Sequence, residues 1–516
     1  MEYLLSALPA VFDLQVLLYT LVGVVLGMFI GAMPGLSATM GVAILLPLTF
    51  WVEPKAGLGM LLGIYNSAIY AGGISAILLG VPGTPASIAS TFDGPKISKR
   101  GQPTLALWIN TVYSVLGGLV GVLLLSLASF PIARFALRFG PPEYAMVALF
   151  GLSMMVAVSG KSVSKGIMVG FIGLGLAMVG MDPMHGVKRY TFGQFILLDG
   201  FSFVPIMIGL FGIGEALKQL SETPVPKWKL SGKVQNASSV NLSDFVHEEK
   251  NAKKHMTLKE MWQTKWAFLF TCIVSVFVGA IPGTGGDIAA LVSWTECKSF
   301  SKEKEQYGEG SLEALAVTCA ANNACIGGAM TTMLTLGIPG DSVTAILIGA
   351  LMMYNYTPGP LLFAEHPDMV QILFLLLVVC NVMILFLGNF GSKLFAKFTK
   401  LPRSWISTTI IVFSLVGSYA IQNSAFDVFV CLCAGILGFV MAKGDFPSGP
   451  IVLALILGDM VESNFIRSMM LPPGTYSTFF VRPISLVLII LTVLSLFGQP
   501  LFKLIKKTIV NKKGGN

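Results

Sequence analysis

The sequence predicts an all-α integral membrane protein with two inverted repeats and one extra C-terminal helix. Three observations predict this fold class. Hydrophobic residues make up 54% of the 516 residues, charged residues only 12%, and the mean hydropathy is +0.78, whereas a soluble domain carries about 25% charged residues. Uncharged stretches of bilayer-crossing length recur along the chain. Pro-Gly pairs interrupt such stretches at matching places in the two halves.

The uncharged stretches bound the number of membrane segments. No charge occurs between Trp266 and Gly286 or between Pro483 and Phe502, and a longer uncharged run follows Asp13. A helix needs roughly 20 apolar residues to cross the bilayer, which predicts about 11 to 14 membrane segments. Some of these are expected to be broken or re-entrant half-helices, because Pro34 and Gly35 divide the run after Asp13.

The charged segments orient the chain in the bilayer. Residues 218–265 hold nine lysines against five acidic residues and include a Ser/Asn-rich patch, a composition typical of a flexible linker. The C-terminal tail is rich in lysine, whereas the start of the chain carries only Glu2 and Asp13. By the positive-inside rule, the linker and the C-terminus are cytoplasmic and the N-terminus is periplasmic.

This orientation divides the chain into four parts. A first repeat (1–217) that begins outside and ends at a cytoplasmic linker (218–265) crosses the membrane an odd number of times. The second repeat (266–470) then begins inside, so the two repeats are inverted relative to each other. Residues 471–516 have no partner in the first repeat, and we expect them to form an extra transmembrane helix with a basic tail.

Four Pro-Gly elbows (34–35, 82–83, 282–283 and 339–340) form two matching pairs. The motif Gly31-Ala-Met-Pro-Gly-Leu-Ser-Ala-Thr39 is echoed 248 positions later by Gly279-Ala-Ile-Pro-Gly-Thr-Gly-Gly-Asp287. The motif Gly80-Val-Pro-Gly-Thr-Pro-Ala-Ser87 is echoed 257 positions later by Gly337-Ile-Pro-Gly-Asp-Ser-Val-Thr344, and Asn66 and Asn323 share that offset. Duplicated, interrupted hydrophobic segments are typical of secondary transporters, whose binding site lies where the interruptions meet.

The chemistry of the elbows favours binding of an anion. Proline and glycine open the helix, and the freed backbone groups must lie in a buried or water-filled cavity. Each elbow is followed by a new helix start, whose partial positive charge, together with nearby hydroxyl groups, suits carboxylates. The alternative is that the elbows are structural kinks. The predicted substrate-binding residues are Pro34, Gly35, Ser37, Thr39, Asn66, Pro82, Gly83, Thr84, Ser87, Pro282, Gly283, Thr284, Pro339, Gly340, Ser342 and Thr344.

Acidic residues distinguish the second half from the first. Asp287 stands where the first repeat has Thr39, and Asp341 where it has Thr84. An intramembrane acid is costly unless it binds a cation or a proton. We therefore predict a coupling-ion site for Na⁺ or H⁺ at these two aspartates, with Asn322 and Asn323 as further candidates. The alternative is that each aspartate caps a helix.

Other residues argue against further chemistry. The cysteines and the four histidines show no metal-ligand spacing, so no cofactor other than the coupling ion is expected. A membrane-embedded enzyme is disfavoured because no nucleophile or acid/base cluster is evident. The net charge of +8 resides in loops, and no nucleic-acid surface is expected. Asp459 and Glu462 are interpreted as marking a membrane boundary, and Lys96–Arg100, Lys188 and Arg189 as loop charges.

The motifs at 31–37, 80–85, 279–283 and 337–341, together with Asp93-Gly94-Pro95, resemble the TctA family, the large membrane subunit of the tripartite tricarboxylate transporters. The resemblance covers most of the chain. It implies a multi-pass protein of the bacterial inner membrane that imports citrate or a related di- or tricarboxylate, driven by an ion gradient. It also implies a small TctB-type membrane subunit and a periplasmic TctC-type solute-binding protein. A stand-alone organic-anion carrier is the alternative.

Overall fold

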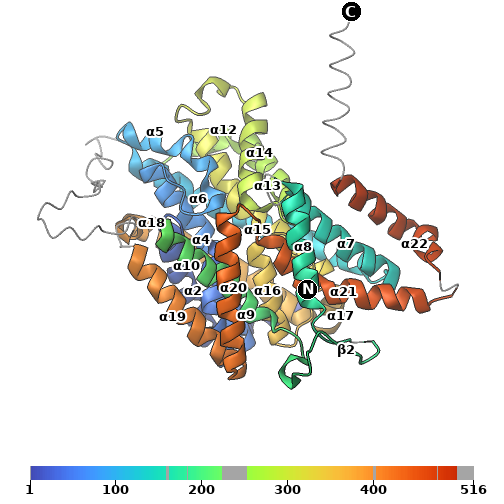
Figure 1. Cartoon of the computed structure of the whole chain (residues 1–516). Coiled ribbons are helices and arrows are strands. Elements are labelled where there is room, and N and C mark those ends of the chain that lie inside the picture. Colours follow the sequence, from blue (N-terminus) through green and yellow to red (C-terminus); the bar gives the residue numbers. More distant parts are fainter. Residues whose placement is uncertain are drawn as a thin grey trace, which may run out of the picture.

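The computed structural model describes residues 2–158, 162–182, 184–222, 253–398, 403–472 and 475–496. Over these residues the protein is almost entirely helical (Figure 1), and the strands described are β1 (Gly180–Met181) and β2 (Lys188–Arg189), which form an antiparallel pair. Seven of the described helices are long and apolar enough to cross a membrane, and six shorter apolar helices accompany them. The prediction of an all-α membrane protein is confirmed.

The first half begins with a broken helical hairpin and ends with a helix that contains a π-helical turn. Its elements are α1 (Glu2–Val11), α2 (Leu14–Ala32), α3 (Ala38–Leu45), η1 (Leu46–Trp51), α4 (Pro54–Leu79), η2 (Pro85–Ser87), η3 (Ala89–Thr91), α5 (Gly94–Lys99), α6 (Pro103–Ala136), α7 (Pro141–Val158), α8 (Val163–Ala177), η4 (Phe195–Leu197), α9 (Phe203–Met207), η5 (Ile208–Ile213) and α10 (Gly214–Glu222).

The second half begins in the same way, with a helix, a returning helix and a long buried helix. Its elements are α12 (Leu258–Gln263), α13 (Lys265–Gly279), α14 (Gly285–Phe300), η6 (Lys304–Gln306), α15 (Leu312–Leu336), α16 (Ser342–Met353), α17 (Pro360–Glu365), α18 (Pro367–Phe398), α19 (Arg403–Gln422), α20 (Ala425–Lys443), α21 (Gly449–Met470), α22 (Ser477–Val481) and the helix Pro483–Leu496. Most of the predicted linker and the basic tail lie outside the described residues, and the predicted division into four parts stays a prediction.

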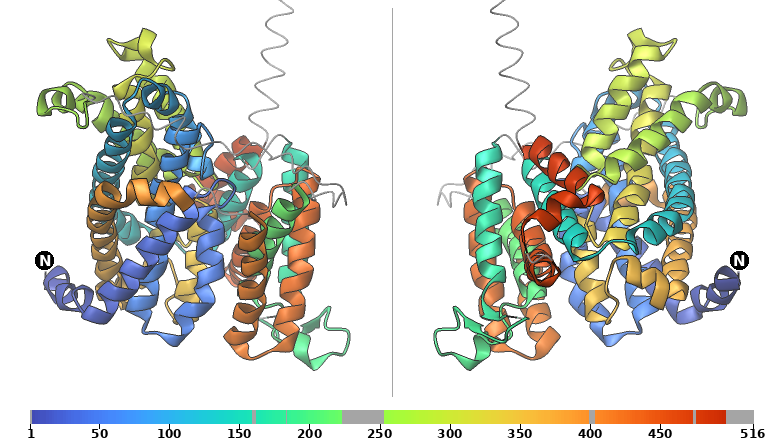
Figure 2. Two further views of the ribbon diagram at one scale, coloured as in Figure 1. Left: turned by 90° about the vertical axis from the view of Figure 1, so that its left-hand side faces the viewer. Right: turned by 90° about the vertical axis from the view of Figure 1, so that its right-hand side faces the viewer.

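The two faces of the molecule carry different segments. Figure 2 shows α12 and the residues next to the linker at one end, which we call the linker side. The β1–β2 pair lies at the opposite end, which we call the hairpin side. The end of α16 contacts the turn that precedes α4, because Tyr354 donates a hydrogen bond to the carbonyl of Thr49 in η1.

Small residues let α2 and α13 lie unusually close to the following long helix. A Cβ on Gly31 would stand 2.1 Å from the carbonyl oxygen of Ala68, and one on Gly279 would stand 2.2 Å from that of Cys325. Such close backbone approach is typical of helix packing in membranes. In each half, the first helix therefore runs beside α4 or α15, stops within the protein at an elbow, and is followed by a returning helix, α3 or α14.

Helices of each half pack against helices of the other half. Helix α6 of the first half packs along α15 of the second, while α18 of the second half packs along α4 of the first. In the same way, α8 packs on α21, and α20 packs on η5 and α10. These contacts come in pairs in which the halves change roles, and the inverted arrangement of the two repeats stays a prediction.

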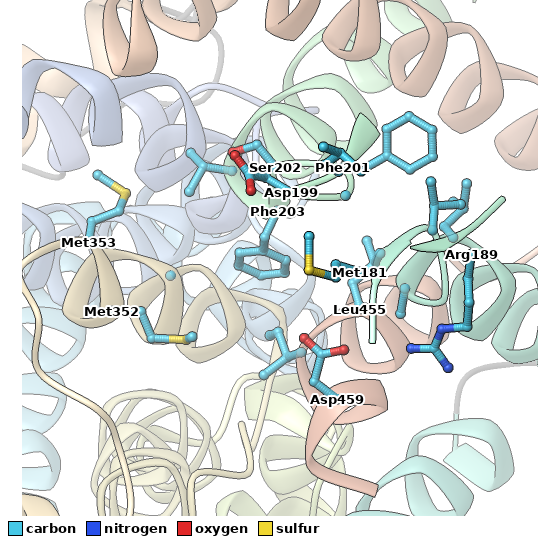
Figure 3. Close-up of a pocket in the computed structure, with 18 residues that line it drawn as sticks. Met181, Arg189, Asp199, Phe201, Ser202, Phe203, Met352, Met353, Leu455 and Asp459 are labelled. Carbon is cyan, nitrogen blue, oxygen red and sulfur yellow. The ribbon is translucent and has the colours of Figure 1, made fainter. Parts of the chain in front are cut away.

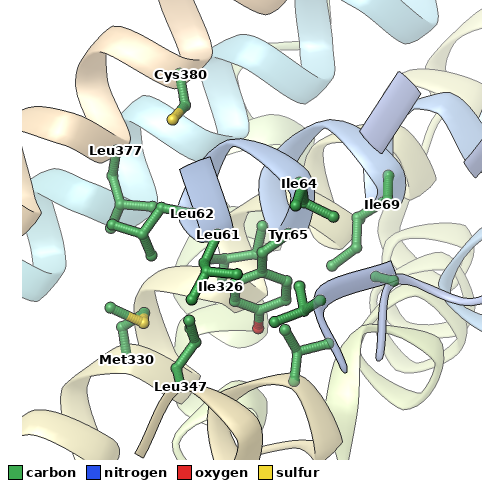
Figure 4. Close-up of a cluster of buried hydrophobic side chains, with 14 of the residues drawn as sticks. Leu61, Leu62, Ile64, Tyr65, Ile69, Ile326, Met330, Leu347, Leu377 and Cys380 are labelled. Carbon is green, nitrogen blue, oxygen red and sulfur yellow. The ribbon is translucent and has the colours of Figure 1, made fainter. Parts of the chain in front are cut away.

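The core is centred on α4, which is buried along its whole length. Figure 4 shows Tyr65 and Ile64 of α4 among Ile326 of α15, Leu347 of α16 and Leu377 of α18. Removing this much apolar surface from lipid adds little by itself, so close packing and internal polar contacts must hold the helices together.

Candidate functional site

The four elbows meet around one cavity of about 260 Å³. Each predicted motif contributes to its wall, although the first and last contributing residues are separated by more than 300 positions in the sequence. The lining residues are Ser37, Ala38, Thr39, Ile69, Thr84, Pro85, Ala86, Gly283, Thr284, Gly285, Gly286, Asp287, Asp341, Ser342 and Val343. This convergence is what the inverted-repeat reading of the sequence leads one to expect.

Glycine ends the long helices where the elbows begin. Gly80 terminates α4 with φ +68°, and Gly337 terminates α15 with φ +71°. Side chains other than glycine rarely adopt this left-handed conformation. The chain then turns back toward the helix that it has just left, and the amide of Gly83 donates a hydrogen bond of 3.2 Å to the carbonyl of Gly72.

The second elbow of each half is pressed against the end of the first. A Cβ on Gly83 would stand 2.1 Å from the carbonyl oxygen of Gly31, and a Cβ on Gly340 would stand 2.4 Å from that of Gly279. The amide of Gly283 also donates a hydrogen bond of 2.7 Å to the carbonyl of Gly340. Only glycine permits this approach, which explains why both elbows use Pro-Gly and not proline alone.

Three helices begin at the cavity wall. These are α3, α14 and α16, and Ser37 caps the first of them by accepting a hydrogen bond of 3.1 Å from the amide of Met40. The first N–H groups of each helix have no partner within that helix and carry partial positive charge. No lysine or arginine is found among the residues that line this cavity, so helix starts and hydroxyl groups are its electropositive features.

Eight of the twenty predicted substrate and ion residues line the cavity, and the other twelve do not. Ser87 donates a hydrogen bond of 2.8 Å to the carbonyl of Thr84, and Gly35 accepts one from Gln219. Lining residues that the sequence reasoning missed are Ala38, Ile69, Pro85, Ala86, Gly285, Gly286 and Val343. Most of these residues follow an elbow directly, so their position in the sequence, and not their side-chain chemistry, could have identified them. The binding role of the whole set stays a prediction.

The two aspartates have different surroundings. Asp341 caps α16: its Oδ1 accepts hydrogen bonds of 2.8 Å from the amide and the hydroxyl of Thr344, and its Oδ2 accepts one of 2.6 Å from the hydroxyl of Tyr65. The helix-cap alternative therefore describes Asp341. Asp287 lies in the first turn of α14 and lines the cavity without a comparable clamp among the described side chains.

The predicted asparagines meet at the contact between the two halves. The Nδ2 group of Asn323 donates hydrogen bonds to Oδ1 of Asn66 at 2.6 Å and to its carbonyl at 3.2 Å. The two residues are 257 positions apart, the same offset that relates the elbows. Both are buried, as is Asn322. This pair joins α4 to α15.

Comparison with known proteins identifies the family. The sequence matches the model of the tripartite tricarboxylate transporter TctA family over residues 17–453. The chain belongs to the TctA family. It is therefore a multi-pass membrane transporter subunit, which agrees with the resemblance carried by its elbow motifs.

Two relatives from Agrobacterium vitis resemble this TctA-family chain. One is a 52.8 kDa protein in the TAR-I ttuC′ 3′ region, which is 32% identical over 476 residues, 91% of this chain and 90% of the relative. The other is a protein in the TAR-II ttuC′ 3′ region, 30% identical over 208 residues, which are 40% of this chain and 86% of the relative.

The Asp93-Gly-Pro motif of this TctA-family chain holds the linker side of the site together. Oδ1 of buried Asp93 accepts hydrogen bonds of 2.9 Å from the amides of Gly308, Gly310 and Ser311, and its Oδ2 accepts one of 3.0 Å from the indole of Trp294. We call this contact the Asp93 clasp. It fastens the segment after the second elbow to the loop between α14 and α15.

The basic residues next to Asp93 extend the clasp. Lys96 forms an ion pair of 2.9 Å with Glu309, and Arg100 donates a hydrogen bond of 3.2 Å to the carbonyl of Gly310. These residues were interpreted as loop charges, but the structure places Lys96 in the short helix α5 and Arg100 at its C-terminal end, where both contact the loop between α14 and α15. The pKa of Glu309 is lowered, first by its hydrogen bond with Lys96 and then by the positive charge of that residue.

A second, larger cavity of about 540 Å³ opens near the hairpin side (Figure 3). Asp199 and Asp459 lie on two of its walls, while Met352 of α16 forms part of a third. Arg189 of β2 also lines it and forms a two-pronged ion pair with Glu462 of α21, in which Nη2 and Oε2 are 3.1 Å apart. Glu462 and Arg189 are therefore partners, a contact that no sequence signal indicated.

Proposed function

We propose that this chain is the large membrane subunit of a binding-protein-dependent importer for citrate or a related di- or tricarboxylate in the bacterial inner membrane. Transport is driven by a Na⁺ or H⁺ gradient and not by a chemical reaction. The N-terminus is periplasmic and the C-terminus cytoplasmic, so the hairpin side faces the periplasm. Family membership supports the transport class, and the cavity formed by the elbows supports the substrate class.

The convergence of four elbows on one cavity is the observation that carries the proposal. Three helix starts and the hydroxyl groups of Ser37, Thr39 and Ser342 surround the space. Such a wall attracts carboxylates without requiring a buried lysine or arginine. The cavity volume of about 260 Å³ is close to the lower limit of typical ligand pockets, roughly 300 Å³, and therefore favours a small substrate.

The carboxylates of the cavity call for a cation. Asp287 and Asp341 line the same space that the anionic substrate would enter, and like charges in a poorly solvated site repel strongly. A bound Na⁺ or a proton removes this repulsion, which couples substrate binding to the ion. Asp287 is the more suitable acid for this role, because the oxygens of Asp341 already accept hydrogen bonds from Thr344 and Tyr65.

The two cavities and the Asp93 clasp suggest a route. Helix α16 contributes Val343 to the elbow cavity and Met352 to the larger cavity, so substrate released on the hairpin side reaches the elbows along this helix. The clasp fastens the opposite side. Opening that side while closing the other requires a movement between pseudo-symmetric states, as in other inverted-repeat transporters.

Two partners complete the proposal: a small TctB-type membrane subunit and a periplasmic TctC-type solute-binding protein that delivers the carboxylate at the hairpin side. A stand-alone carrier is the alternative within the transporter class. An enzyme is disfavoured, since the polar side chains that line the elbow cavity are hydroxyls and two carboxylates, with no nucleophile–base pair among them.

Uptake into proteoliposomes tests the proposal. The subunit is reconstituted with its small membrane partner, the cognate binding protein and radiolabelled citrate, under an imposed Na⁺ or H⁺ gradient. Accumulation that needs the binding protein supports the tripartite importer, whereas equal uptake without that protein supports the stand-alone carrier. If no di- or tricarboxylate accumulates under either gradient, the substrate class is wrong.

Two matched variants connect the uptake to the cavity. Ser342→Ala removes a hydroxyl from the cavity wall, and we expect it to raise the KM for the carboxylate at least several-fold. Thr332→Val removes a hydroxyl of α15 that bonds only to the carbonyl of Ala329 at 3.4 Å and does not line the cavity. Equal effects of both substitutions on KM would place the binding site elsewhere.

A further inference from the structure

The short helix α12 and the start of α13 carry an exposed apolar stripe. Leu258, Trp262 and Trp266 follow one another at four-residue steps, and their side chains are 85%, 69% and 70% exposed. Thr264, which joins the two helices, keeps a backbone close to helical (φ −83°, ψ −1°), so the three side chains share one face. Large apolar groups gathered in this way mark a contact with a membrane or another protein.

The opposite face of this segment is held by the protein. Met256 and Thr264 are buried, and the hydroxyl of Thr264 lies 2.7 Å from that of Tyr113 in α6. Phe268 packs edge to face on Tyr113, with 5.8 Å between the ring centroids. These contacts fix the direction of the stripe away from the bundle, and Figure 2 shows α12 projecting sideways on the linker side.

The stripe continues down α13 into the membrane. Phe270, Ile273 and Phe277 are exposed on the same helix, and no charge occurs between Trp266 and Gly286. Tryptophan is enriched at the level of the lipid headgroups, at the end of the hydrocarbon layer. The boundary of the hydrocarbon therefore falls near Trp266, with the acyl chains beside Phe270 to Phe277 and the headgroups beside α12.

A lysine lies between the two indoles at this boundary. The Nζ atom of Lys265 stands 3.6 Å from the ring centroid of Trp262 and 5.5 Å from that of Trp266. An ammonium group that packs on an aromatic face is attracted by it and still presents N–H groups to an acceptor, and each indole adds one N–H donor. Within the described part of the chain, neither indole N–H has an acceptor and Lys265 has no acidic partner.

The charge around this lysine is positive. Glu260 is the acidic residue of α12, and it is paired with Lys253. Lys254 and Lys259 are exposed, and neither forms an ion pair with another residue that the structure describes. The surface of α12 therefore keeps positive charge next to an apolar stripe, which is complementary to a ligand with an anionic head and an apolar tail.

We propose that α12 and the start of α13 bind an anionic phospholipid, whose phosphate contacts Lys265 and the two indoles and whose acyl chain lies along Phe270 and Phe277. Lysines close to a membrane surface attract anionic headgroups, and the stripe requires an apolar partner at the same place. Inorganic phosphate would satisfy the lysine but leave the stripe uncovered. This inference does not depend on which carboxylate the protein transports.

The position of this lipid site connects it to the elbow cavity. Helix α13 begins at Lys265 and ends at Gly279, which is pressed against the carbonyl of Cys325 in α15. A lipid bound at the first turn of α13 restrains the start of the helix that leads to the third elbow. The lipid would therefore stabilise the folded chain as well as occupy its surface.

Thermal unfolding of the purified full chain in an uncharged detergent tests the site without substrate. Dioleoyl phosphatidylglycerol is compared with dioleoyl phosphatidylcholine, which has the same acyl chains but no net charge, at constant ionic strength. Because a ligand that binds the folded state raises the unfolding temperature, we expect a saturable rise with phosphatidylglycerol. Its apparent Kd should be about tenfold lower than that of phosphatidylcholine, and inorganic phosphate should produce no shift.

Matched variants locate the site. Lys265→Gln should raise the apparent Kd for phosphatidylglycerol about fivefold or more, whereas Lys265→Arg keeps a cation that stacks on indoles and should stay within about threefold. Lys302→Gln removes the same charge from an exposed position after α14 and should leave the Kd unchanged. An equal response to the two lipids, an equal shift with inorganic phosphate, or an unchanged Kd in Lys265→Gln overturns the proposal.

Quenching of tryptophan fluorescence decides the question if a lysine variant fails to fold. Phosphatidylglycerol with brominated acyl chains should quench the unmodified chain more strongly than brominated phosphatidylcholine does. This difference should disappear when Trp262→Phe and Trp266→Phe are combined. If the two lipids quench equally, and Trp262→Ala releases a co-purified small membrane subunit while Lys302→Gln retains it, the stripe is a protein interface and the lipid assignment is wrong.

Discussion

The second elbows of the two halves have similar backbone turns, but side chains hold them in place at different positions along the chain. In the second half, the tip of the elbow is fixed, because Asp341 caps α16 and accepts a hydrogen bond from Tyr65. In the first half, Thr84 occupies the equivalent tip and is held locally, because the hydroxyl of Ser87 donates a hydrogen bond to the carbonyl of Thr84 and accepts one from its amide. There the chain is fastened farther along, where Asp93 binds the loop before α15.

The difference shows that a duplicated backbone can carry two separate tasks. A tip that is tied to α4 keeps α16 in place beside the cavity. The tip at Thr84 is held only by its neighbour Ser87, and the segment that follows is held by the Asp93 clasp on the linker side. The predictions below test whether these two fastenings differ in strength and in purpose.

The largest effect is expected from the Asp93 clasp. Asp93→Ala leaves three backbone amides and the indole of Trp294 without their acceptor in a buried place. Leaving buried donors without an acceptor costs about 1–3 kcal/mol in the free energy of unfolding for each group, so several such groups give the largest expected loss. Chemical unfolding in mixed detergent measures the loss. The exposed Asp368→Ala serves as the control and should cost less than about 1 kcal/mol, and equal losses in both variants would remove the clasp from the comparison.

The tied tip of the second half ranks next. Tyr65→Phe removes a donor from the Asp341 carboxylate, and a hydrogen bond to a charged group contributes about 1.5–3 kcal/mol. Tyr70→Phe is a matched control on the same helix, because it removes a neutral hydrogen bond of 2.9 Å with Thr111, for which about 0.5–1.5 kcal/mol is expected. Unfolding of the two variants side by side should show the larger loss at Tyr65; the reverse order would mean that the tip is not tied through Asp341.

A helix cap separates stability from transport. Ser37→Ala removes the cap of α3, and Ser311→Ala removes the cap of α15, whose Oγ accepts a hydrogen bond of 3.2 Å from the amide of Ala314. Each should cost about 1 kcal/mol. Only Ser37 lines the elbow cavity, so carboxylate uptake should fall in Ser37→Ala beyond what its stability explains and should persist in Ser311→Ala. Parallel uptake losses in the two variants would argue against a binding role for the first elbow.

The smallest effect is expected at the rim of the clasp. Glu309 is exposed and pairs with Lys96, and exposed ion pairs contribute little. Because the pKa of Glu309 is lowered from its ordinary value of 4.5, chiefly by the hydrogen bond with Lys96, its contribution is complete above that value and is lost as the pH falls below it. Glu309→Gln should therefore change the unfolding temperature slightly at pH 7 and by less at pH 3. A larger difference at pH 3 than at pH 7 contradicts the pairing.

The sequence predicted the elbows well, but it did not predict the long-range hydrogen bonds that hold them in place. Proline and glycine have fixed effects on the backbone, so the four motifs, their offsets and their convergence follow from residue types alone. The pairing of Tyr65 with Asp341 and of Asp93 with Gly308 and Gly310 joins residues that are more than 200 positions apart. No local pattern encodes such contacts, since they depend on which helices of one half pack against the other.

The larger cavity illustrates the same limit. Arg189 and Glu462 were assigned separately to a loop and a membrane boundary, and only the packing of α21 beside α8 brings the hairpin near Glu462. Asp341 was open between an ion ligand and a helix cap because both roles use the same residue at the same helix position. The structure shows the cap, and the tyrosine that also bonds to Asp341 lies in the other half of the protein; an ion-binding role for Asp341 stays a prediction.

The packing of each half's helices against the other half constrains how the chain can be made. While the ribosome is still synthesising the second half, α4 has neither α15 nor α18 beside it, and Asn66 lacks its amide partner. A polar side chain facing lipid is unfavourable. The newly inserted first half therefore cannot complete its packing until the second half has been synthesised. Neither half can mature alone, and two fragments divided between residues 222 and 253 should survive in the membrane only when they are produced together.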